Sequence, residues 1–263
     1  MTSAYDSGAE RFERQRALPP GGAPAIHAAV LAGLAAPRPR LLDLGAGSGR
    51  IGWPFVAARD DYVGVDLSIG MLRAFASRPD LPPTCAVLLA QADGLRLPFA
   101  DASFDAVLLM QVLSASGDWR ALLAETTRVL RRAGSLIVGR TLAPEDGIDA
   151  RMKQHLGEIL DAMGVRPYRQ QATDAALAWL SGTAQSSHGV VATSWIAERT
   201  PRQFLERHGG GARFSALPAP IQAAALRQAT HWATERFGSL DAVFRESFSY
   251  ELSFFQPQPG KPH

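Results

Sequence analysis

The chain has 263 residues, of which 46% are hydrophobic and 20% are charged, and its formal net charge is +2. This composition is ordinary for a soluble globular protein, and a near-neutral charge without a dense basic run argues against nucleic-acid binding. No apolar stretch reaches the roughly 20 residues of a membrane span. The single cysteine, Cys85, excludes an intramolecular disulfide and is typical of a reducing compartment. We therefore expect a cytoplasmic protein with no membrane span and no nucleic-acid partner.

The first 35 residues are predicted to form a helical cover. A charged helix is expected over residues 5–16 and an alanine-rich helix over residues 25–34. The Pro-Pro-Gly-Gly run at residues 19–22 separates them, because proline and glycine interrupt helices.

The glycine-rich stretch after residue 40 is the feature around which the remaining motifs are arranged. Residues 41–44 are a short apolar run broken by Asp43, which is typical of a buried parallel strand. Glycines follow at alternate positions: Gly45, Gly47 and Gly49. Without a Cβ, such residues let backbone N–H groups approach a ligand closely. A helix that begins just after them would point its positive end at the same place.

Two further strands each end in an acid. Residues 62–66 form the second strand and end in Asp66, whose carboxylate can accept hydrogen bonds from both hydroxyls of a ribose. A third apolar run, residues 87–89, leads to Asp93, which is placed to accept from an exocyclic amine such as that of adenine. The alternative for Asp93 is a turn-forming Asp-Gly pair.

A fourth strand is predicted over residues 104–110 and a helix over residues 118–132. Asp118 is a plausible N-cap for this helix, and two arginines, Arg131 and Arg132, suit its carboxyl end. Gly134 ends the helix, and residues 135–139 are expected to form the fifth strand.

The order of these motifs resembles the class I S-adenosylmethionine-dependent methyltransferases. The stretches that carry the resemblance are DLGAGSG, VDLS, ADGLRLPFADASFDAV and WRALLAETTRVLRRAG. They look most like the small-molecule branch that includes the ubiquinone- and menaquinone-type enzymes, over roughly residues 35 to 142. The resemblance implies an α/β, Rossmann-like fold. Its seven-stranded sheet is mostly parallel, with one antiparallel strand and helices on both faces.

The resemblance also implies S-adenosyl-L-methionine as the cofactor. The cofactor-binding residues that we predict are Asp43, Gly45, Ala46, Gly47, Asp66, Leu67, Met71, Asp93, Gly94 and Gln111. In relatives an N-terminal segment lies over the cofactor, so Tyr5, Phe12 and Arg16 are candidates to touch the methionine part. Arg16 is able to pair with its carboxylate. A solvated helix face is the alternative for each of these three residues.

The whole chain is predicted to be one methyltransferase domain. Residues 1–35 are its cover, residues 36–142 its cofactor-binding core and residues 143–187 a helical lid insertion. Residues 188–256 complete the sheet with helices and strands, and the last strand alternates apolar and polar residues. Four apolar residues of the lid suggest a small apolar or aromatic acceptor: Met152, Ile159, Met163 and Trp179.

Methyl transfer from a sulfonium is an in-line displacement, so the main task of the protein is to hold the acceptor in attack geometry and to exclude water. A base is needed only where the acceptor must lose a proton. His155 is the candidate, because it is the ionisable group on the apolar face of the lid. A packed, hydrogen-bonded core histidine is the alternative. No metal site is expected, and the sequence leaves the oligomeric state open.

Three other functions were weighed. A dinucleotide-binding oxidoreductase using NAD(P) would need a third glycine at position 50, where the chain has Arg50. A nucleic-acid methyltransferase usually carries an Asn/Asp-Pro-Pro-aromatic run after the fourth strand, and residues 110–113 read Met-Gln-Val-Leu. A non-catalytic relative that binds the cofactor as a scaffold or regulator would keep the same motifs.

Overall fold

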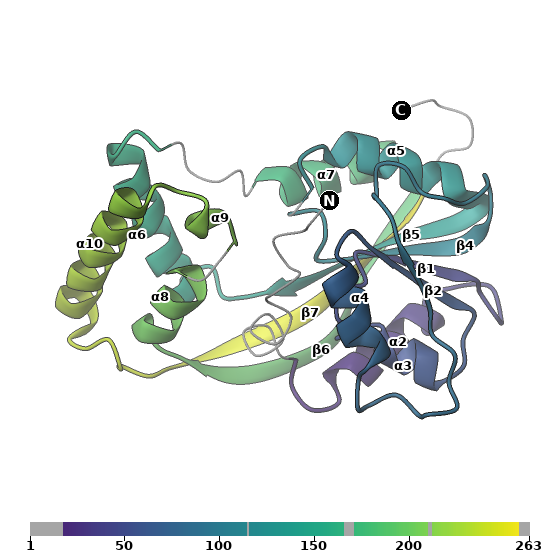
Figure 1. Ribbon diagram of the computed structural model, residues 1–263, viewed down its shortest axis with the longest axis horizontal. Helices are drawn as coiled ribbons and strands as arrows, with labels where there is room; N and C mark the ends of the chain where they lie inside the picture. The colour runs from purple at the N-terminus through teal and green to yellow at the C-terminus, as the bar shows by residue number, and fades with distance from the viewer. Residues whose placement is uncertain (1–17, 115, 166–170, 210–211, 258–263) are drawn as a thin grey trace. The chain divides into compact units, whose positions relative to one another are not determined.

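A computed structural model describes residues 18–114, 116–165, 171–209 and 212–257 (Figure 1). The chain divides into two compact units. The first, here the sheet unit, comprises Met1–Thr141, Gln170–Thr193 and Tyr250–His263. The second, here the helical unit, comprises Leu142–Arg169 and Ser194–Ser249. The segment predicted to be a lid, residues 143–187, is therefore shared between the two units.

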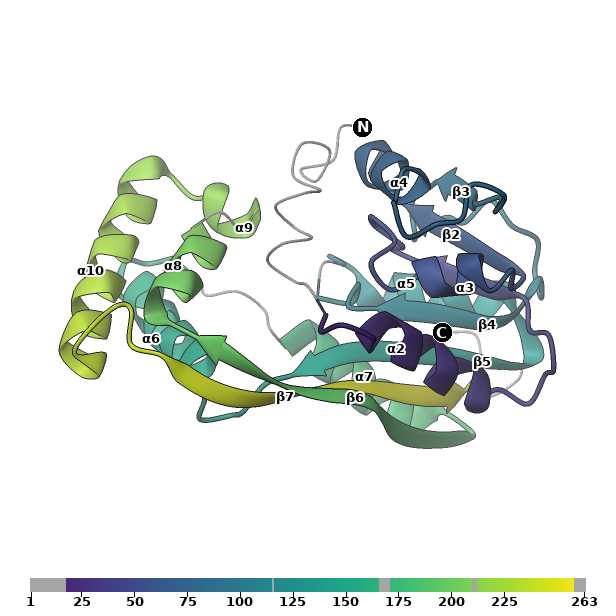
Figure 2. The same cartoon turned by 90° about the horizontal axis from the view of Figure 1, so that it is seen from below.

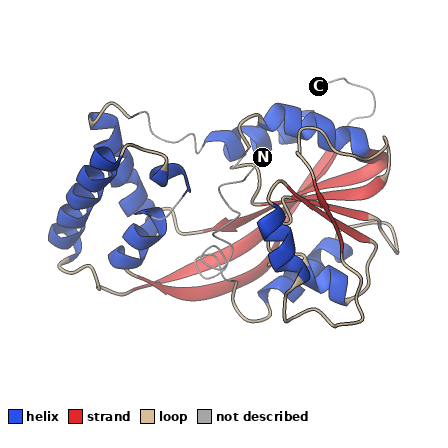
Figure 3. Ribbon diagram, viewed as in Figure 1, coloured by secondary structure: helices blue, strands red, loops and turns tan. Residues whose placement is uncertain are grey.

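The described residues form one seven-stranded sheet with the strand order β3-β2-β1-β4-β5-β7-β6 (Figure 3). The strands are β1 Leu41–Leu44, β2 Tyr62–Asp66, β3 Leu88–Gln91, β4 Phe104–Met110, β5 Leu130–Leu142, β6 Ser186–Arg199 and β7 Phe244–Gln256. The first five pair in parallel with their neighbours. The sheet as a whole is mixed and mostly parallel, so the predicted α/β class is confirmed.

Helices cover both faces of the sheet within the sheet unit. They are α2 Gly22–Ala32, α3 Trp53–Ala57, α4 Ile69–Ala76, α5 Trp119–Val129 and α7 Gln171–Thr183. Figure 1 shows α5 and α7 along one side of the sheet, and Figure 2 shows α2 and α3 along the other. Side chains alternate across each strand, so Leu42 and Leu44 join the core under α5 and α7. Asp43 and its neighbour Tyr62 point to the opposite face.

The predicted helix at residues 118–132 is confirmed at its start and corrected at its end. Asp118 is the N-cap, and its Oδ1 accepts from the backbone N–H groups of Arg120 and Ala121 at 3.1 and 3.0 Å. The helix ends at Val129, and Arg131 already belongs to β5. Extended backbone is favoured there because Leu130 pairs with Phe104, which satisfies backbone groups that a further helical turn would have used.

The helical unit contains α6 Ile148–Ala162, α8 Pro201–Gly209, α9 Ala212–Ser215 and α10 Ala219–Phe237. Thr200 caps α8, since its hydroxyl oxygen accepts from the N–H of Gln203 at 3.2 Å. Gly238 ends α10 in a left-handed conformation. The apolar face of α6 is buried in the core of this unit against Phe204 and the alanine stripe of α10.

The apolar residues assigned to an acceptor pocket are explained by packing in two cores. Met152 and Ile159 are buried in the helical unit, and Met163 packs against the same core. Trp179 belongs to the sheet unit, where its ring meets that of Trp119 edge to face at 6.0 Å. Apolar residues at helical spacing predict a buried face but not the element that packs on it. The spacing of these four residues therefore gives no support for an apolar acceptor.

The alternating last strand is confirmed. Its inward residues Phe248, Tyr250, Leu252 and Phe254 are all buried. None of the described helices combines the length and the apolarity that a membrane crossing would require.

Candidate functional site

The three glycines after β1 adopt left-handed backbone conformations for different reasons. Their φ angles are +78° at Gly45, +57° at Gly47 and +76° at Gly49. A Cβ on Gly45 would lie 2.7 Å from the side chain of Val112, and a Cβ on Gly49 would lie 2.1 Å from the ring of Phe75. Among the described residues, the atom nearest to a Cβ on Gly47 would lie 3.9 Å away. Gly45 and Gly49 are thus required by packing, whereas no described residue crowds Gly47.

The backbone N–H groups of this loop are used within the chain, which corrects one expectation. Gly45 and Ala46 donate to the carbonyl oxygen of Val65 at 2.8 and 3.0 Å, and Gly47 donates to Oδ2 of Asp66 at 2.9 Å. The first described helix after the loop begins only at Trp53. Strand β2 extends beyond β1, so its last residues accept the N–H groups that we had expected to face a ligand.

Asp66 lies half-buried at the carboxyl end of β2. Its Oδ1 accepts from the N–H of Ser68 at 2.8 Å, and its Oδ2 accepts from Gly47. Ser68 itself caps α4 by accepting from the N–H of Met71 at 3.2 Å, so Asp66 is not needed as the cap. Asp66 is therefore a carboxylate that two backbone N–H groups hold next to Gly47, where no described residue crowds the backbone.

Asp43 lies below the loop and does not reach the surface. Its carboxyl group is 1% exposed, and its Oδ2 accepts a 2.6 Å hydrogen bond from the hydroxyl of Tyr62. Burial raises the pKa of Asp43 to about 7. The Tyr62 hydrogen bond lowers it, and the charge of Asp66 raises it further. In the described part of the chain, Oδ1 of Asp43 has no hydrogen-bond partner. Asp43 therefore supports the loop from the core side.

The predicted adenine-side residues lie after β3 and β2. Asp93 is exposed, and its Oδ1 accepts from the N–H of Leu95 at 2.9 Å, which is the turn that we weighed as the alternative. Gly94 has no room for a side chain, because a Cβ there would lie 2.8 Å from Leu122. Leu67 is 45% exposed, whereas Met71 is buried.

Gln111 follows β4 and is connected to a residue that sequence reasoning missed. Its φ is +64°, and its backbone N–H donates to the carbonyl of Gly139 at 2.9 Å. Its side-chain oxygen accepts from the guanidinium of Arg50 at 3.0 Å, and its side-chain nitrogen donates to the hydroxyl of Thr141 at 2.7 Å. Arg50 could have been identified from the sequence, because it directly follows Gly49, the last glycine of the loop.

The structure brings together predicted residues at the carboxyl ends of β1, β2 and β4: Asp43, Gly45, Ala46, Gly47, Asp66 and Gln111. His155 belongs to the helical unit, where its ring stacks on Trp232 at 4.2 Å and its Nδ1 lies 3.1 Å from Oε2 of Glu158. Arg140 forms ion pairs with Glu251 at 3.1 Å and Asp174 at 3.7 Å. Tyr5, Phe12 and Arg16 lie outside the described residues.

Comparison with known proteins shows what this chain is similar to. Residues 42–138 match the family model described as "Methyltransferase domain". The chain is 39% identical over 130 residues to a demethylmenaquinone methyltransferase of Corynebacterium urealyticum, covering 49% of this chain and 53% of that protein. It is 30% identical over 127 residues to the uncharacterized methyltransferase YcgJ of Bacillus subtilis, covering 48% and 50%. The chain thus spans about half the length of these curated relatives.

Solved structures share the fold over most of the chain. The crystal structure of the Bacillus YcgJ protein has a TM-score of 0.56 and 19% identity, and covers 90% of this chain and 99% of its own. A putative type II methyltransferase from Anaeromyxobacter dehalogenans has a TM-score of 0.58 and 19% identity, with 90% and 97% coverage. Residues 42–138 are therefore similar in sequence to methyltransferase domains, and most of the chain shares the fold of the solved structures.

Proposed function

We propose that this protein binds S-adenosyl-L-methionine and transfers its methyl group to a small-molecule acceptor. The observation that carries the proposal is the carboxylate of Asp66, which two backbone N–H groups hold at the carboxyl end of β2 beside Gly47. A ribose has two adjacent hydroxyl donors, and a carboxylate at the end of this strand is a suitable acceptor for both.

The remaining site residues also fit this cofactor. Asp93 ends the neighbouring strand, where its exposed carboxylate can accept from the adenine amine. Leu67 directly follows Asp66 and presents an exposed apolar side chain, which suits the face of a flat base. The missing side chain at Gly47 leaves room for close approach of a ligand to the backbone.

The chemistry that the bound cofactor supplies is a methyl group on a positively charged sulfur, which is a very good leaving group. The residues described above contribute binding and orientation, which account for much of the rate of such an in-line displacement. We infer that the acceptor is small and apolar or aromatic. The support is that the matched curated relatives include proteins named demethylmenaquinone methyltransferase.

His155 is our proposed general base for an acceptor that must lose a proton. Its support is local: the ring lies on the face of α6 that carries Met152 and Ile159, and it is half-buried. The stacking on Trp232 equally suits a structural role for this histidine.

The test is calorimetric titration of the purified protein with S-adenosylhomocysteine, with NAD as the matched control. Micromolar binding of the first and none of the second is the expected result. Binding of NAD alone would replace the proposal with a nicotinamide enzyme. Binding of S-adenosylhomocysteine without methyl transfer to any of a panel of phenols, quinols and amines would favour a non-catalytic scaffold. No binding by the folded protein would refute the cofactor assignment.

A further inference from the structure

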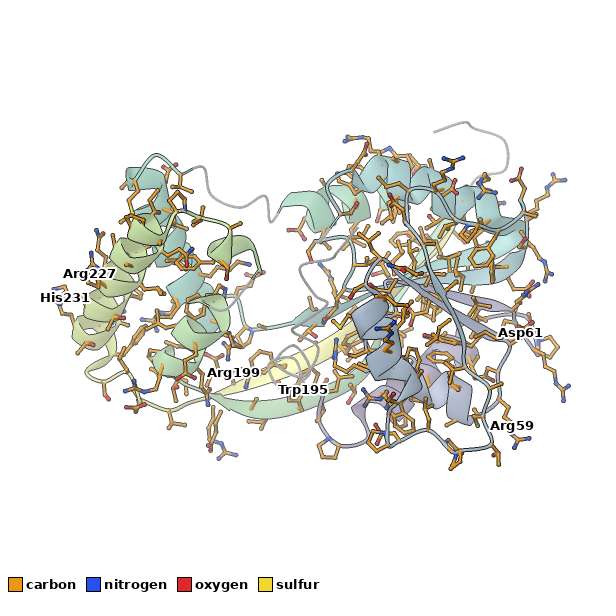
Figure 4. All side chains as sticks on the ribbon, in the orientation of Figure 1. Arg59, Asp61, Trp195, Arg199, Arg227 and His231 are labelled. Carbon is orange, nitrogen blue, oxygen red and sulfur yellow. The ribbon has the colours of Figure 1, made fainter. Side chains whose placement is uncertain are left out.

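Strand β6 ends the sheet on the side of β7. It runs from Ser186 to Arg199, and no strand of the described residues lies along its other edge. Trp195 and Arg199, which Figure 4 labels, both belong to it. An unpaired edge presents a row of backbone N–H and C=O groups that another strand can bind. With 14 residues, β6 is also far longer than a typical strand of about 5–6 residues.

The sequence of β6 lacks the features that usually keep an edge strand from pairing. Natural edge strands are protected by devices such as proline and lysine, and β6 contains neither. Residues 189–197 carry no charged side chain. Three large apolar side chains of this stretch are exposed: Val190 at 36%, Val191 at 58% and Ile196 at 64%. The edge is therefore apolar as well as unpaired, and its burial against another strand is favourable.

A second copy of the chain matches this edge when the two β6 strands run antiparallel about a two-fold axis at Thr193. Positions at equal distances before and after Thr193 then lie opposite each other, because a two-fold interface is self-complementary. Val190 faces Ile196 of the second copy, and Val191 faces Trp195 of the second copy. Opposite residues share one face of the sheet and contact each other. Each exposed apolar side chain therefore meets another apolar side chain.

The same register pairs opposite polar groups near the ends of the strand. His188 lies five residues before the axis and Glu198 five residues after it, and both are exposed. A carboxylate thus faces an imidazole, which is a hydrogen-bond donor and can carry a positive charge. By symmetry this pair forms twice, and opposite charges across two strands stabilise their pairing.

Other positions of the axis lose this match. The axis must pass through a residue, because opposite residues in an antiparallel pair either both bond across it or neither does. With the axis at Ala192, Val190 would face Ser194. With the axis at Ser194, Val190 would face Glu198. The side chains of β6 therefore favour one register over its two neighbours.

We propose that β6 is a dimer interface, at which two copies of this chain pair antiparallel about a two-fold axis at Thr193. The occupant is a second copy because the edge is complementary to itself in its apolar and in its charged positions. All the residues that the pairing uses lie on this one continuous strand. The proposal goes beyond the proposed function and does not depend on it, since none of the candidate cofactor residues lies on β6.

Disulfide cross-linking tests the position of the axis. In a Cys85→Ser background, Thr193→Cys places the two introduced thiols opposite each other, with Cβ atoms about 4.5–5.5 Å apart, near the reach of a disulfide. Val191→Cys is the matched control, because it is more exposed but its two copies lie four residues apart along the strands, about 13 Å.

Diamide oxidation and non-reducing electrophoresis give the readout. Most of the Thr193→Cys protein should run at twice the chain mass of 28.2 kDa. The Val191→Cys protein should form at least about fivefold less of this species, since its thiols are out of reach. Equal cross-linking of the two variants would overturn the axis at Thr193.

Sedimentation equilibrium of the full chain tests the interface itself. The wild type should dimerise at micromolar concentration. Val191→Lys should weaken the dimer at least about tenfold, because lysine on an edge strand opposes pairing. Val243→Lys is the matched control, since Val243 is also 58% exposed but lies outside β6. Its dimer affinity should equal that of the wild type.

A charge exchange tests the register in solution. Glu198→Lys should weaken the dimer at least about twofold, because a cation then faces His188 twice. Adding His188→Glu to this variant should restore the affinity, since the opposite charges return with their positions exchanged. Failure of the second substitution to restore the affinity would overturn the pairing of these two positions.

Two further results would overturn the dimer proposal. One is a wild-type protein that stays monomeric at all concentrations. The other is a dimer that Val191→Lys leaves intact, because its interface would then lie elsewhere. If Val191→Lys does not fold, the two cysteine variants decide, since they change less of the side chain. Cofactor binding is unaffected by each of these results, so the dimer and the proposed function can fail separately.

Discussion

The hydroxyl of Tyr62 donates a 2.6 Å hydrogen bond to the carboxyl group of Asp43, and both side chains are buried. The phenol ring is held between Phe55, with ring centres 5.7 Å apart, and Phe75, with ring centres 6.1 Å apart. A polar pair at the end of β1 is thus fixed by aromatic packing under α3 and α4. This pair holds the strand end from which the glycine loop departs.

Tyr62→Phe should destabilise the protein by about 1–3 kcal/mol, because a buried carboxyl oxygen loses its donor. The free energy of unfolding in urea at pH 7 is the measurement. Tyr250→Phe is the control, since in the described part of the chain its hydroxyl donates to the weak acceptor sulfur of Met110, at 3.5 Å. Equal losses in the two variants would contradict the importance that we give to the Tyr62–Asp43 bond.

Asp43 should contribute to the free energy of unfolding, and this contribution should decrease as the pH rises from about 4 to about 7. Burial raises the pKa of Asp43 from 3.8 to about 7, so the folded state binds a proton that the unfolded chain has released. The stabilisation that Asp43 contributes is therefore fully present below pH 4 and is lost as the pH rises toward 7. The slope is at most about 1.4 kcal/mol per pH unit.

The measurement is the difference between wild type and Asp43→Asn across this range. Taking the difference removes the opposite contribution of His208, whose pKa burial lowers to about 4. A difference that does not vary with pH would show that Asp43 titrates normally. Asp93→Asn, which changes an exposed carboxylate, should leave the slope unaltered.

Asp66→Ala should weaken binding of S-adenosylhomocysteine more than tenfold while the far-ultraviolet circular dichroism stays unchanged. The variant removes the proposed ribose acceptor and the partner of the Gly47 N–H. Isothermal titration calorimetry measures the loss. Asp61→Ala is the control, because this carboxylate is 54% exposed and lies 3.7 Å from Arg40. Near-normal affinity in Asp66→Ala would exclude the ribose assignment.

Gly47→Ala and Gly49→Ala should have different effects: the first should mainly weaken cofactor binding, and the second should mainly destabilise the fold. Both residues have positive φ, so each alanine carries a backbone cost of about 1–2 kcal/mol. At Gly49 the new Cβ would also meet the ring of Phe75 at 2.1 Å, so the unfolding free energy should drop by several kcal/mol. At Gly47 the loss should stay near the backbone cost while cofactor affinity falls. A larger loss of unfolding free energy in Gly47→Ala than in Gly49→Ala would contradict the local geometry.

His155→Ala should reduce turnover about 100-fold or more if an acceptor that needs deprotonation is used, as is usual for a lost general base. Initial rates with saturating acceptor are the measurement. His231→Ala is the control, because this exposed histidine makes an ion pair with Glu235 one helical turn away. Unchanged turnover in His155→Ala would assign the ring to packing against Trp232.

Sequence alone determined the features that depend on local chemistry. Asp118 was identified as a cap because a polar side chain before an apolar helix has one main use. The inward alternation of the last strand was readable because its two faces differ in polarity. The α/β class followed from the family resemblance that the order of strands, glycines and acids carries.

Tertiary structure decided the features that depend on which segments meet. The carbonyl of Val65 and the carboxylate of Asp66 accept the loop N–H groups because of the register in which β2 pairs with β1, and a local pattern predicts two strands without their register. Likewise Met152 and Trp179, which we assigned to one acceptor pocket, pack in different cores, since amphipathic spacing specifies a buried face and not its partner. The contact of Arg50 with Gln111 joins residues that the sequence separates by three strands. Only the parallel order of β1 and β4 brings them together.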